Sequence, residues 1–361
     1  MWGSAVGACV AALLAAAPAH AFENPERTPA MSSTLAARSP LIGTARAGKR
    51  IVAVGLRGHI VYSDDEGKSW RQASVPVSTD LVAVSFPTAQ QGWAVGHGGI
   101  VIHSVDGGAT WTKQMDGERF SALAVSYYGK LQQTNASPET KRALNQAQTL
   151  ATDGSTRALL DVYFDSETSG FVVGTFNRIY RTEDGGNTWT PWMERSGNPR
   201  ELHFYSIRGE NGRVLLTGEQ GMVWQLDVTR THFEPIQTPY KGTLFGSVLS
   251  GADIFVFGMR GSLFHSADSG RTWEKVKVPS EAGITGGMAL GPGRMLLVNQ
   301  AGTVLYTGDD GKSFETVKLP HPMAYYGVGD APDGNIALAG SRGVRVEALP
   351  EADRAATRGA N

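Results

Sequence analysis

Cysteine is nearly absent from this 361-residue chain, and its single copy, Cys9, lies in a leading segment that we expect to be removed. A mature chain without cysteine has neither disulfides nor a thiol nucleophile. A charge excess is also absent, because 33 lysines and arginines stand against 34 aspartates and glutamates. We therefore expect no general attraction to nucleic acid. The eight histidines show no metal-binding spacing, so the sequence predicts no metal and no cofactor.

Long apolar runs are scarce as well. The run from Ala5 to Ala17 is shorter than the ~20 residues that a bilayer-spanning helix needs, so we expect no direct membrane insertion. Together with Ala19-His20-Ala21 it predicts a signal peptide over residues 1–21, with cleavage before Phe22. No lysine or arginine precedes the run, which departs from the usual signal pattern. The mature protein is accordingly expected in the periplasm, as a monomer.

Glycine, by contrast, is abundant. The chain has 45 glycines, where average usage of about 7% would give roughly 25. Many glycines with few charged residues are typical of many short strands joined by tight turns.

An eight-residue box of Ser or Thr, Asp, Gly and a closing aromatic residue occurs five times. A box aspartate can accept hydrogen bonds from its own turn, while the glycine permits a left-handed backbone, so we interpret the boxes as structural turns. Too few oxygen ligands are present for a calcium loop. The residues assigned to this structural role are Asp64, Asp106, Asp184, Asp268, Asp309, Trp70, Trp111, Trp189 and Trp273.

A Gly-x-x-Gly turn precedes each box and extends the count to seven units. The turns start at intervals of 41, 78, 44, 40, 41 and 41 residues, and Asn177 replaces the second glycine of the third turn. Units of about 41 residues have room for four strands, the size of a propeller blade. The sequence therefore predicts an all-β, seven-bladed β-propeller of four-stranded antiparallel blades over residues 22–349, followed by a tail over 350–361. The last unit is one strand short, and residues 22–45 are expected to supply that strand.

The 78-residue interval predicts an insertion between blades 2 and 3, over about residues 119–157. Within it, Ser137 and Pro138 are typical of a helix start, and a short helix is expected from Pro138 to Gln148.

The boxes and the phrase Gly-Trp-Ala-Val-Gly at residues 92–96 resemble BNR or Asp-box propellers. Within that group the chain is most similar to the photosystem II assembly and stability factor-like family, over about residues 40–349. The resemblance implies an exported, non-enzymatic protein that helps to assemble a membrane protein complex from its lumenal or periplasmic side. The insertion departs from the plain repeat, and fold alone does not specify the partner.

Basic side chains recur at the turns on one face of the predicted ring. A functional interpretation is a basic recess that binds carboxylates of a partner, because arginine offers a forked set of donors. The alternative is that exposed turns simply tolerate arginine. The candidate partner-binding residues are Arg57, His97, Arg260, Arg342 and, in the insertion, Arg142.

Aromatic residues on the innermost strands have two possible roles. They could line the central channel, or they could pack between blades. The residues concerned are Phe204, Tyr205, Phe245, Tyr325 and Tyr326.

Two other functions remain open at this point. A sialidase-like glycoside hydrolase needs an arginine triad and a tyrosine nucleophile, but the Arg-Ile-Pro signature of that family is missing, since the chain reads Arg38-Ser39-Pro40-Leu41-Ile42. A carbohydrate-binding surface propeller would use the channel aromatics, and glycan binding that depends on them would favour it over an assembly factor.

Overall fold

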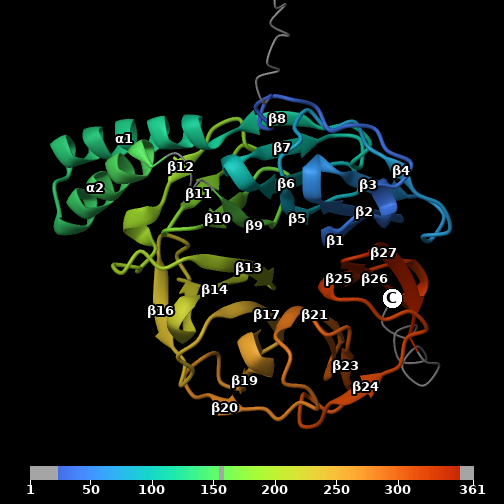
Figure 1. Ribbon diagram of the computed structural model, residues 1–361. Helices are drawn as coiled ribbons and strands as arrows, with labels where there is room; N and C mark the ends of the chain where they lie inside the picture. The colour runs from blue at the N-terminus through green and yellow to red at the C-terminus, as the bar shows by residue number, and fades with distance from the viewer. Residues whose placement is uncertain (1–22, 154–157, 350–361) are drawn as a thin grey trace, which may run out of the picture.

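Seven antiparallel sheets surround a central axis in the computed structural model, which describes residues 23–153 and 158–349 (Figure 1). The predicted propeller is thereby confirmed. The predicted signal peptide, residues 154–157 at the end of the predicted insertion, and the predicted tail lie outside the described residues.

The first four blades each contain four strands in sequence order from the axis outward. Blade 1 consists of β1 (Leu41–Ala47), β2 (Arg50–Gly55), β3 (Ile60–Ser63) and β4 (Arg71–Gln72). Blade 2 consists of β5 (Leu81–Ser85), β6 (Gly92–Gly96), β7 (Val101–Ser104) and β8 (Thr112–Met115). Blade 3 consists of β9 (Leu159–Phe164), β10 (Gly170–Gly174), β11 (Ile179–Thr182) and β12 (Thr190–Pro191). Blade 4 consists of β13 (Phe204–Glu210), β14 (Arg213–Gly218), β15 (Met222–Leu226) and β16 (Phe233–Gln237).

The remaining three blades complete the ring. Blade 5 consists of β17 (Leu244–Ser250), β18 (Asp253–Gly258), β19 (Leu263–Ser266) and β20 (Glu274–Lys275). Blade 6 consists of β21 (Ile284–Gly291), β22 (Arg294–Asn299), β23 (Val304–Thr307) and β24 (Glu315–Val317). Blade 7 has three strands, β25 (Tyr325–Asp330), β26 (Asn335–Gly340) and β27 (Gly343–Ala348).

The second strand of every blade is the most buried part of the fold. In β6 and β10 every residue is buried, and in β2 only the first residue, Arg50, is partly exposed. Such a strand is covered by the neighbouring blade on each face, so it reads as a continuous apolar run rather than an alternating one. This burial explains why the sequence before each turn is almost free of charge.

The boxes close the turn between the third and fourth strands of five blades, on what we call the box face. In blade 2, Asp106 accepts a hydrogen bond from the Ser104 hydroxyl at 2.8 Å, and its two carboxylate oxygens accept from the amide and hydroxyl of Thr110 at 2.9 and 2.7 Å. The amide of Gly108, at φ +87°, donates to the Ser104 hydroxyl at 2.8 Å. Asp184, Asp268 and Asp309 form the same set of bonds in their own blades.

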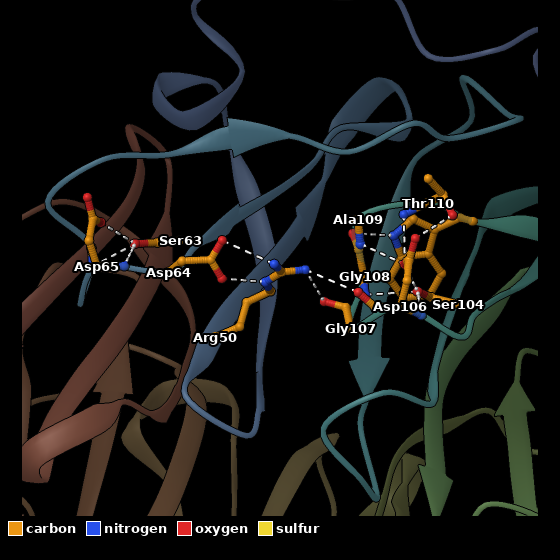
Figure 2. Close-up of polar contacts among 12 residues, drawn as sticks. Arg50, Ser63, Asp64, Asp65, Ser104, Asp106, Gly107, Gly108, Ala109 and Thr110 are labelled. Carbon is orange, nitrogen blue, oxygen red and sulfur yellow. Dashed lines mark hydrogen bonds and ion pairs between the residues drawn. The ribbon is translucent and has the colours of Figure 1, made fainter.

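In the first box the predicted position was wrong by one residue. Asp65, not Asp64, accepts from Ser63 and from the amide and hydroxyl of Ser69. Asp64 instead forms a bidentate ion pair with Arg50, at 2.6 and 3.1 Å. Figure 2 shows that the same guanidinium also reaches the main-chain oxygens of the second box, at residues 106 and 107. The two adjacent aspartates thus differ in role, because only Asp65 lies four residues before Ser69, the spacing that the box hydrogen bonds require.

Each box also packs against the preceding blade. For the first box the preceding blade is blade 7, so this contact closes the ring. A Cβ on Gly67 would lie 2.3 Å from the side chain of Val346, which shows how tightly the first box meets blade 7. Trp70 joins the same small core with Ala331 and Ala337.

The expectation that residues 22–45 complete blade 7 was wrong. Residues 41–45 begin the innermost strand of blade 1, and no described residue pairs with the outer edge of β27. The N-terminal segment before them crosses blades 1 and 2 instead. The amide of Ala30 donates to the Val75 carbonyl at 3.0 Å, and η1 (Ala36–Arg38) lies against β27.

The insertion forms a hairpin of two helices, α1 (Gly117–Thr134) and α2 (Pro138–Thr152), where one short helix was expected. Asp116 caps α1, and Ser137 with Thr140 forms a capping box on α2. The hairpin packs along the outer side of blade 3, against β12 and η5 (Met193–Arg195), and projects outward beyond the ring (Figure 1). None of the helices in the described part of the chain is long and apolar enough to cross a membrane.

Candidate functional site

The turns between the second and third strands lie together on the face opposite the boxes, which we call the turn face. In six of the seven blades the second residue of the turn donates its amide to the connection that enters the blade. In blades 2, 5 and 7, for example, these bonds join His97 to the carbonyl of Asp80 at 2.9 Å, Met259 to that of Thr243 at 3.3 Å and Ser341 to that of Ala324 at 2.9 Å. The turn face is therefore a hydrogen-bonded platform built from turns and blade connections.

Non-glycine residues occupy the left-handed position of several of these turns. Arg57, Gln220 and Arg260 have φ of 58°, 58° and 55°. A left-handed conformation costs a side-chain-bearing residue on the order of 1–3 kcal/mol, so it persists where the surroundings hold it in place. The conformation fixes these side chains at the surface with little backbone freedom.

All five candidate partner-binding residues are exposed, but they are spread around the ring rather than gathered in one recess. Arg57 and His97 come closest together, through Asp80. Its carboxylate accepts the Arg57 amide at 2.8 Å and lies 4.0 Å from the His97 ring. Arg342, in blade 7, donates to the carbonyl of Pro322.

The other two arginines lie elsewhere on the ring. Arg260 lies on blade 5, and Arg142 lies on α2 beside a cavity of about 100 Å³ that Asn177 also lines. The guanidinium groups of Arg57, Arg142 and Arg260 make no hydrogen bond or ion pair with the described residues. Their donors are therefore available to bind an external anion.

A feature that the sequence did not reveal is a β-bulge near the start of each innermost strand. In blade 4, for example, Phe204 pairs with Gly218 and Ser206 pairs with Thr217, which leaves Tyr205 unpaired. Six of the seven bulged residues line a central channel of about 610 Å³. The bulged residues are Ile42, Val82, Leu160, Tyr205, Phe245, Thr285 and Tyr326.

The bulges explain which aromatic residues pack and which are accessible. Phe204 and Tyr325, immediately before a bulge, are 0% and 1% exposed and belong to the packing between blades. Tyr205 and Tyr326 line the channel, and Tyr326 is 36% exposed. Both interpretations of the aromatics are thus right, each for different residues.

Four partly exposed rings form a continuous cluster on blades 3 to 5. The ring of Tyr205 lies 5.7 Å from that of Phe245 and 6.2 Å from that of His203, which in turn lies 4.5 Å from Phe176 in the blade 3 turn. Burial raises the pKa of Tyr205, so its hydroxyl stays protonated at neutral pH.

A buried polar network holds the edge of this cluster. Asn177, at φ 56° and 3% exposed, donates to the Gln146 side chain and the Met193 carbonyl, both at 3.3 Å. Its side-chain oxygen accepts from Ser196 at 2.8 Å and from Asn198 at 3.1 Å. Gln146 of α2 also donates to the carbonyl of Phe176 at 2.9 Å, so the insertion fixes the blade 3 turn.

Two polar pairs near the channel and the insertion are already engaged with each other. Arg208 is the one arginine among the described channel-lining residues, and it forms an ion pair with Asp161, which also accepts the Ile207 amide. Tyr128 and Glu194 form a tyrosine–carboxylate pair at 2.6 Å, but Tyr128 is fully buried and its pKa is raised well above its usual value by burial. No group of three metal-ligating side chains occurs in the described residues.

Solved structures with the same architecture include two proteins named YCF48. A structure of YCF48 bound to D1 peptide superposes with a TM-score of 0.64 at 17% identity, covering 90% of this chain and all of that one. YCF48 from Cyanidioschyzon merolae superposes with a TM-score of 0.63 at 15% identity, covering 90% of this chain and 98% of that one. At these identities the likeness establishes the fold alone.

Sequence comparisons identify a narrower group. The photosystem II assembly protein Ycf48 of Synechococcus sp. (strain JA-2-3B'a(2-13)) is 26% identical over 262 residues, covering 58% of this chain and 79% of that protein. The photosystem II assembly lipoprotein Ycf48 of Synechococcus sp. (strain CC9902) is 26% identical over 247 residues, covering 61% and 70%. A family model described as photosynthesis system II assembly factor YCF48 matches residues 44–130 and 139–236, more than half of the chain. This chain therefore belongs to the YCF48 family of photosynthesis system II assembly factors.

Proposed function

We propose that this protein is a non-enzymatic assembly factor that binds a segment of a membrane protein complex on its turn face. Membership of the YCF48 family supports the class of function, and a member of the same fold binds D1 peptide. For this chain we propose that the bound segment is an exposed, acidic peptide portion of the complex.

The observation that carries the proposal is the set of unpaired arginines. Arg57 and Arg260 are exposed, held by left-handed turns and without partners among the described residues. A guanidinium group recognises a carboxylate through two parallel hydrogen bonds, and a fixed backbone lowers the entropy lost on binding. Opposite charges would also speed the encounter with an acidic segment.

We further propose that the protein acts after export, on the periplasmic or lumenal side. The predicted signal peptide supports this location, and one relative is named a lipoprotein. A role without catalysis is supported by Arg208, the one arginine among the described residues that line the channel, which is already paired, and by the inaccessible hydroxyl of Tyr128.

Crosslinking in intact cells with the full-length chain, followed by mass spectrometry, tests the proposal. Arg57→Ala with Arg260→Ala should reduce recovery of the membrane partner while leaving the thermal transition nearly unchanged, because both side chains are exposed.

The matched control removes two positive charges from the opposite face, at Arg271 and Lys312, which occupy the same place in two boxes. Arg271→Ala with Lys312→Ala should capture the partner as the wild type does. Equal capture of the partner by the wild type and both double variants would show that the turn-face arginines do not bind it.

A further inference from the structure

The turn face is divided chemically into two halves. Blades 7, 1 and 2 carry Arg342, Arg57 and His97, which we call the cationic half. Blades 3 to 5 carry an aromatic half, consisting of Phe176, His203, Tyr205, Phe245 and Met259.

Buried aliphatic residues already fill the core between blades 4 and 5. Leu244, which is 0% exposed, packs there with Leu215 and Val223. Tyr205 and Phe245 are the unpaired residues of their bulges and remain partly exposed. Met259 is 43% exposed. Accessible apolar side chains grouped beside a channel mouth are typical of a binding surface.

The aromatic half is also held in one conformation. Phe176 has φ of 52°, a strained value for an aromatic residue, and Gln146 of α2 fixes its carbonyl. Glu219 accepts the amide of His203 at 2.9 Å and lies 3.8 Å from its ring. An ordered pocket edge lowers the entropic cost of binding a side chain.

Charge of both signs borders the aromatic half. Glu219 lies 3.8 Å from the His203 ring, and Arg260, which follows Met259 in the blade 5 turn, makes no hydrogen bond or ion pair with the described residues. A carboxylate bound by Arg260 would lie next to the apolar side chains, so this half suits a segment in which acidic and apolar residues are close together.

We propose that the aromatic half is a second subsite, which takes an apolar or aromatic side chain of the same peptide segment whose carboxylates bind the cationic half. The inference rests on the proposed function and adds a sequence requirement to it. The partner segment must combine an acidic part with an aromatic or large apolar residue, and the insertion helix α2 acts as a positioning element for that subsite through Gln146.

Panning a displayed library of random peptides against the full chain tests this directly. The wild type should enrich peptides that contain both carboxylates and an aromatic or large apolar residue. Tyr205→Ala with Phe245→Ala should lose the aromatic enrichment and keep the acidic one, whereas Arg57→Ala with Arg342→Ala should do the reverse. Met259→Asp, at an exposed position, tests the subsite without disturbing packing. Val228→Asp, at a 99% exposed position on the opposite face, is its control.

The outcomes separate the two proposals. Acidic peptides without aromatic enrichment would overturn the subsite and leave the proposed function standing. Aromatic enrichment without carboxylates, or no enrichment at all, would overturn both. For a selected synthetic peptide, Met259→Asp and Gln146→Ala should each weaken binding, the former by about tenfold. Replacing the peptide's aromatic residue by alanine should then abolish the difference between wild type and Gln146→Ala; a persisting difference would show that Gln146 does not act through this subsite.

Discussion

Residues in the left-handed conformation are required by the Gly-x-x-Gly repeat and also lie on the turn face, where we propose that the partner binds. The Gly-x-x-Gly turn requires this conformation, and most blades meet the requirement at its last position with glycine. At position 177 the chain uses asparagine, which also tolerates a positive φ. The structure gives a further reason for asparagine, because only a side chain with donors and an acceptor can join the insertion, η5 and blade 3 at one buried point.

Asn177→Gly therefore separates the backbone requirement from the side-chain one. Glycine accepts the φ of 56° without strain, but it leaves Gln146, Ser196 and Asn198 short of partners in the interior. We expect a loss of about 2–3 kcal/mol in the free energy of unfolding, measured by urea denaturation. Gln220→Gly, at an exposed left-handed position, should change it by less than about 1 kcal/mol. Similar values for the two variants would contradict this role for Asn177.

At the scale of elements, the hydroxyl of Tyr128 is one of the buried polar groups that join the α1–α2 hairpin to blade 3. The hydroxyl of Tyr128 donates to Glu194 at 2.6 Å and accepts the Met193 amide at 2.8 Å. Burial and the nearby carboxylate of Glu194 both raise the pKa of Tyr128, so the hydroxyl is a donor at neutral pH.

Tyr128→Phe should loosen the hairpin while the rest of the propeller stays intact. The substitution leaves a nearly buried carboxylate and a main-chain amide without this partner, at an expected cost of about 2 kcal/mol. Hydrogen exchange should speed up in α1 and α2 and stay unchanged in blades 5 to 7. Tyr127→Phe, at a half-buried neighbour, is the control. Uniform exchange across the chain would mean that the hairpin does not unfold separately.

The two helices also show which features local sequence signals can predict and which they cannot. Ser137 and Pro138 predicted the start of α2 because capping is a local property. The helix α1 was missed, although Phe120, Ala124 and Tyr128 recur at the four-residue spacing of a buried helix face. Its glycines, at positions 117 and 129, obscured the pattern. The bulges were beyond sequence reasoning, because the unpaired residue is decided by the register between two strands.

At the scale of the whole molecule, the repeat could be recognised in the sequence because every blade packs against its neighbours in the same way. Turn spacing and box chemistry predicted seven blades, and the two faces followed from the order of strands. The closure of the ring was not predictable in the same way. It depends on contact between segments at opposite ends of the chain, such as Gly67 and Val346, for which no repeat provides a signal.

Box carboxylates should make the whole ring sensitive to acid. Hydrogen bonds lower the pKa of Asp65, Asp268 and Asp309 to about 2, and they also lower those of Asp106 and Asp184. A carboxyl group with a lowered pKa in the folded state stabilises the fold above its unfolded pKa, and that stability is lost as the pH falls toward the folded value. The melting temperature should therefore fall steeply from about pH 4 to pH 2.

Calorimetry at several salt concentrations separates this cause from ion pairing. The hydrogen bonds to Asp65, Asp268 and Asp309 come from neutral hydroxyl and amide groups, so added salt should leave the acid transition nearly in place. A transition that moves strongly with salt would point to ion pairs as its cause.

Partner binding on the turn face is the claim on which the functional account depends. The most direct measurement places a photo-crosslinking amino acid at Arg57 or Arg260 on the turn face, and at Arg271 or Lys312 on the box face, in otherwise unchanged full-length protein in intact cells. The account predicts that the turn-face positions crosslink to a common membrane partner and that the box-face positions do not. Crosslinks to that partner from the box face alone would contradict it.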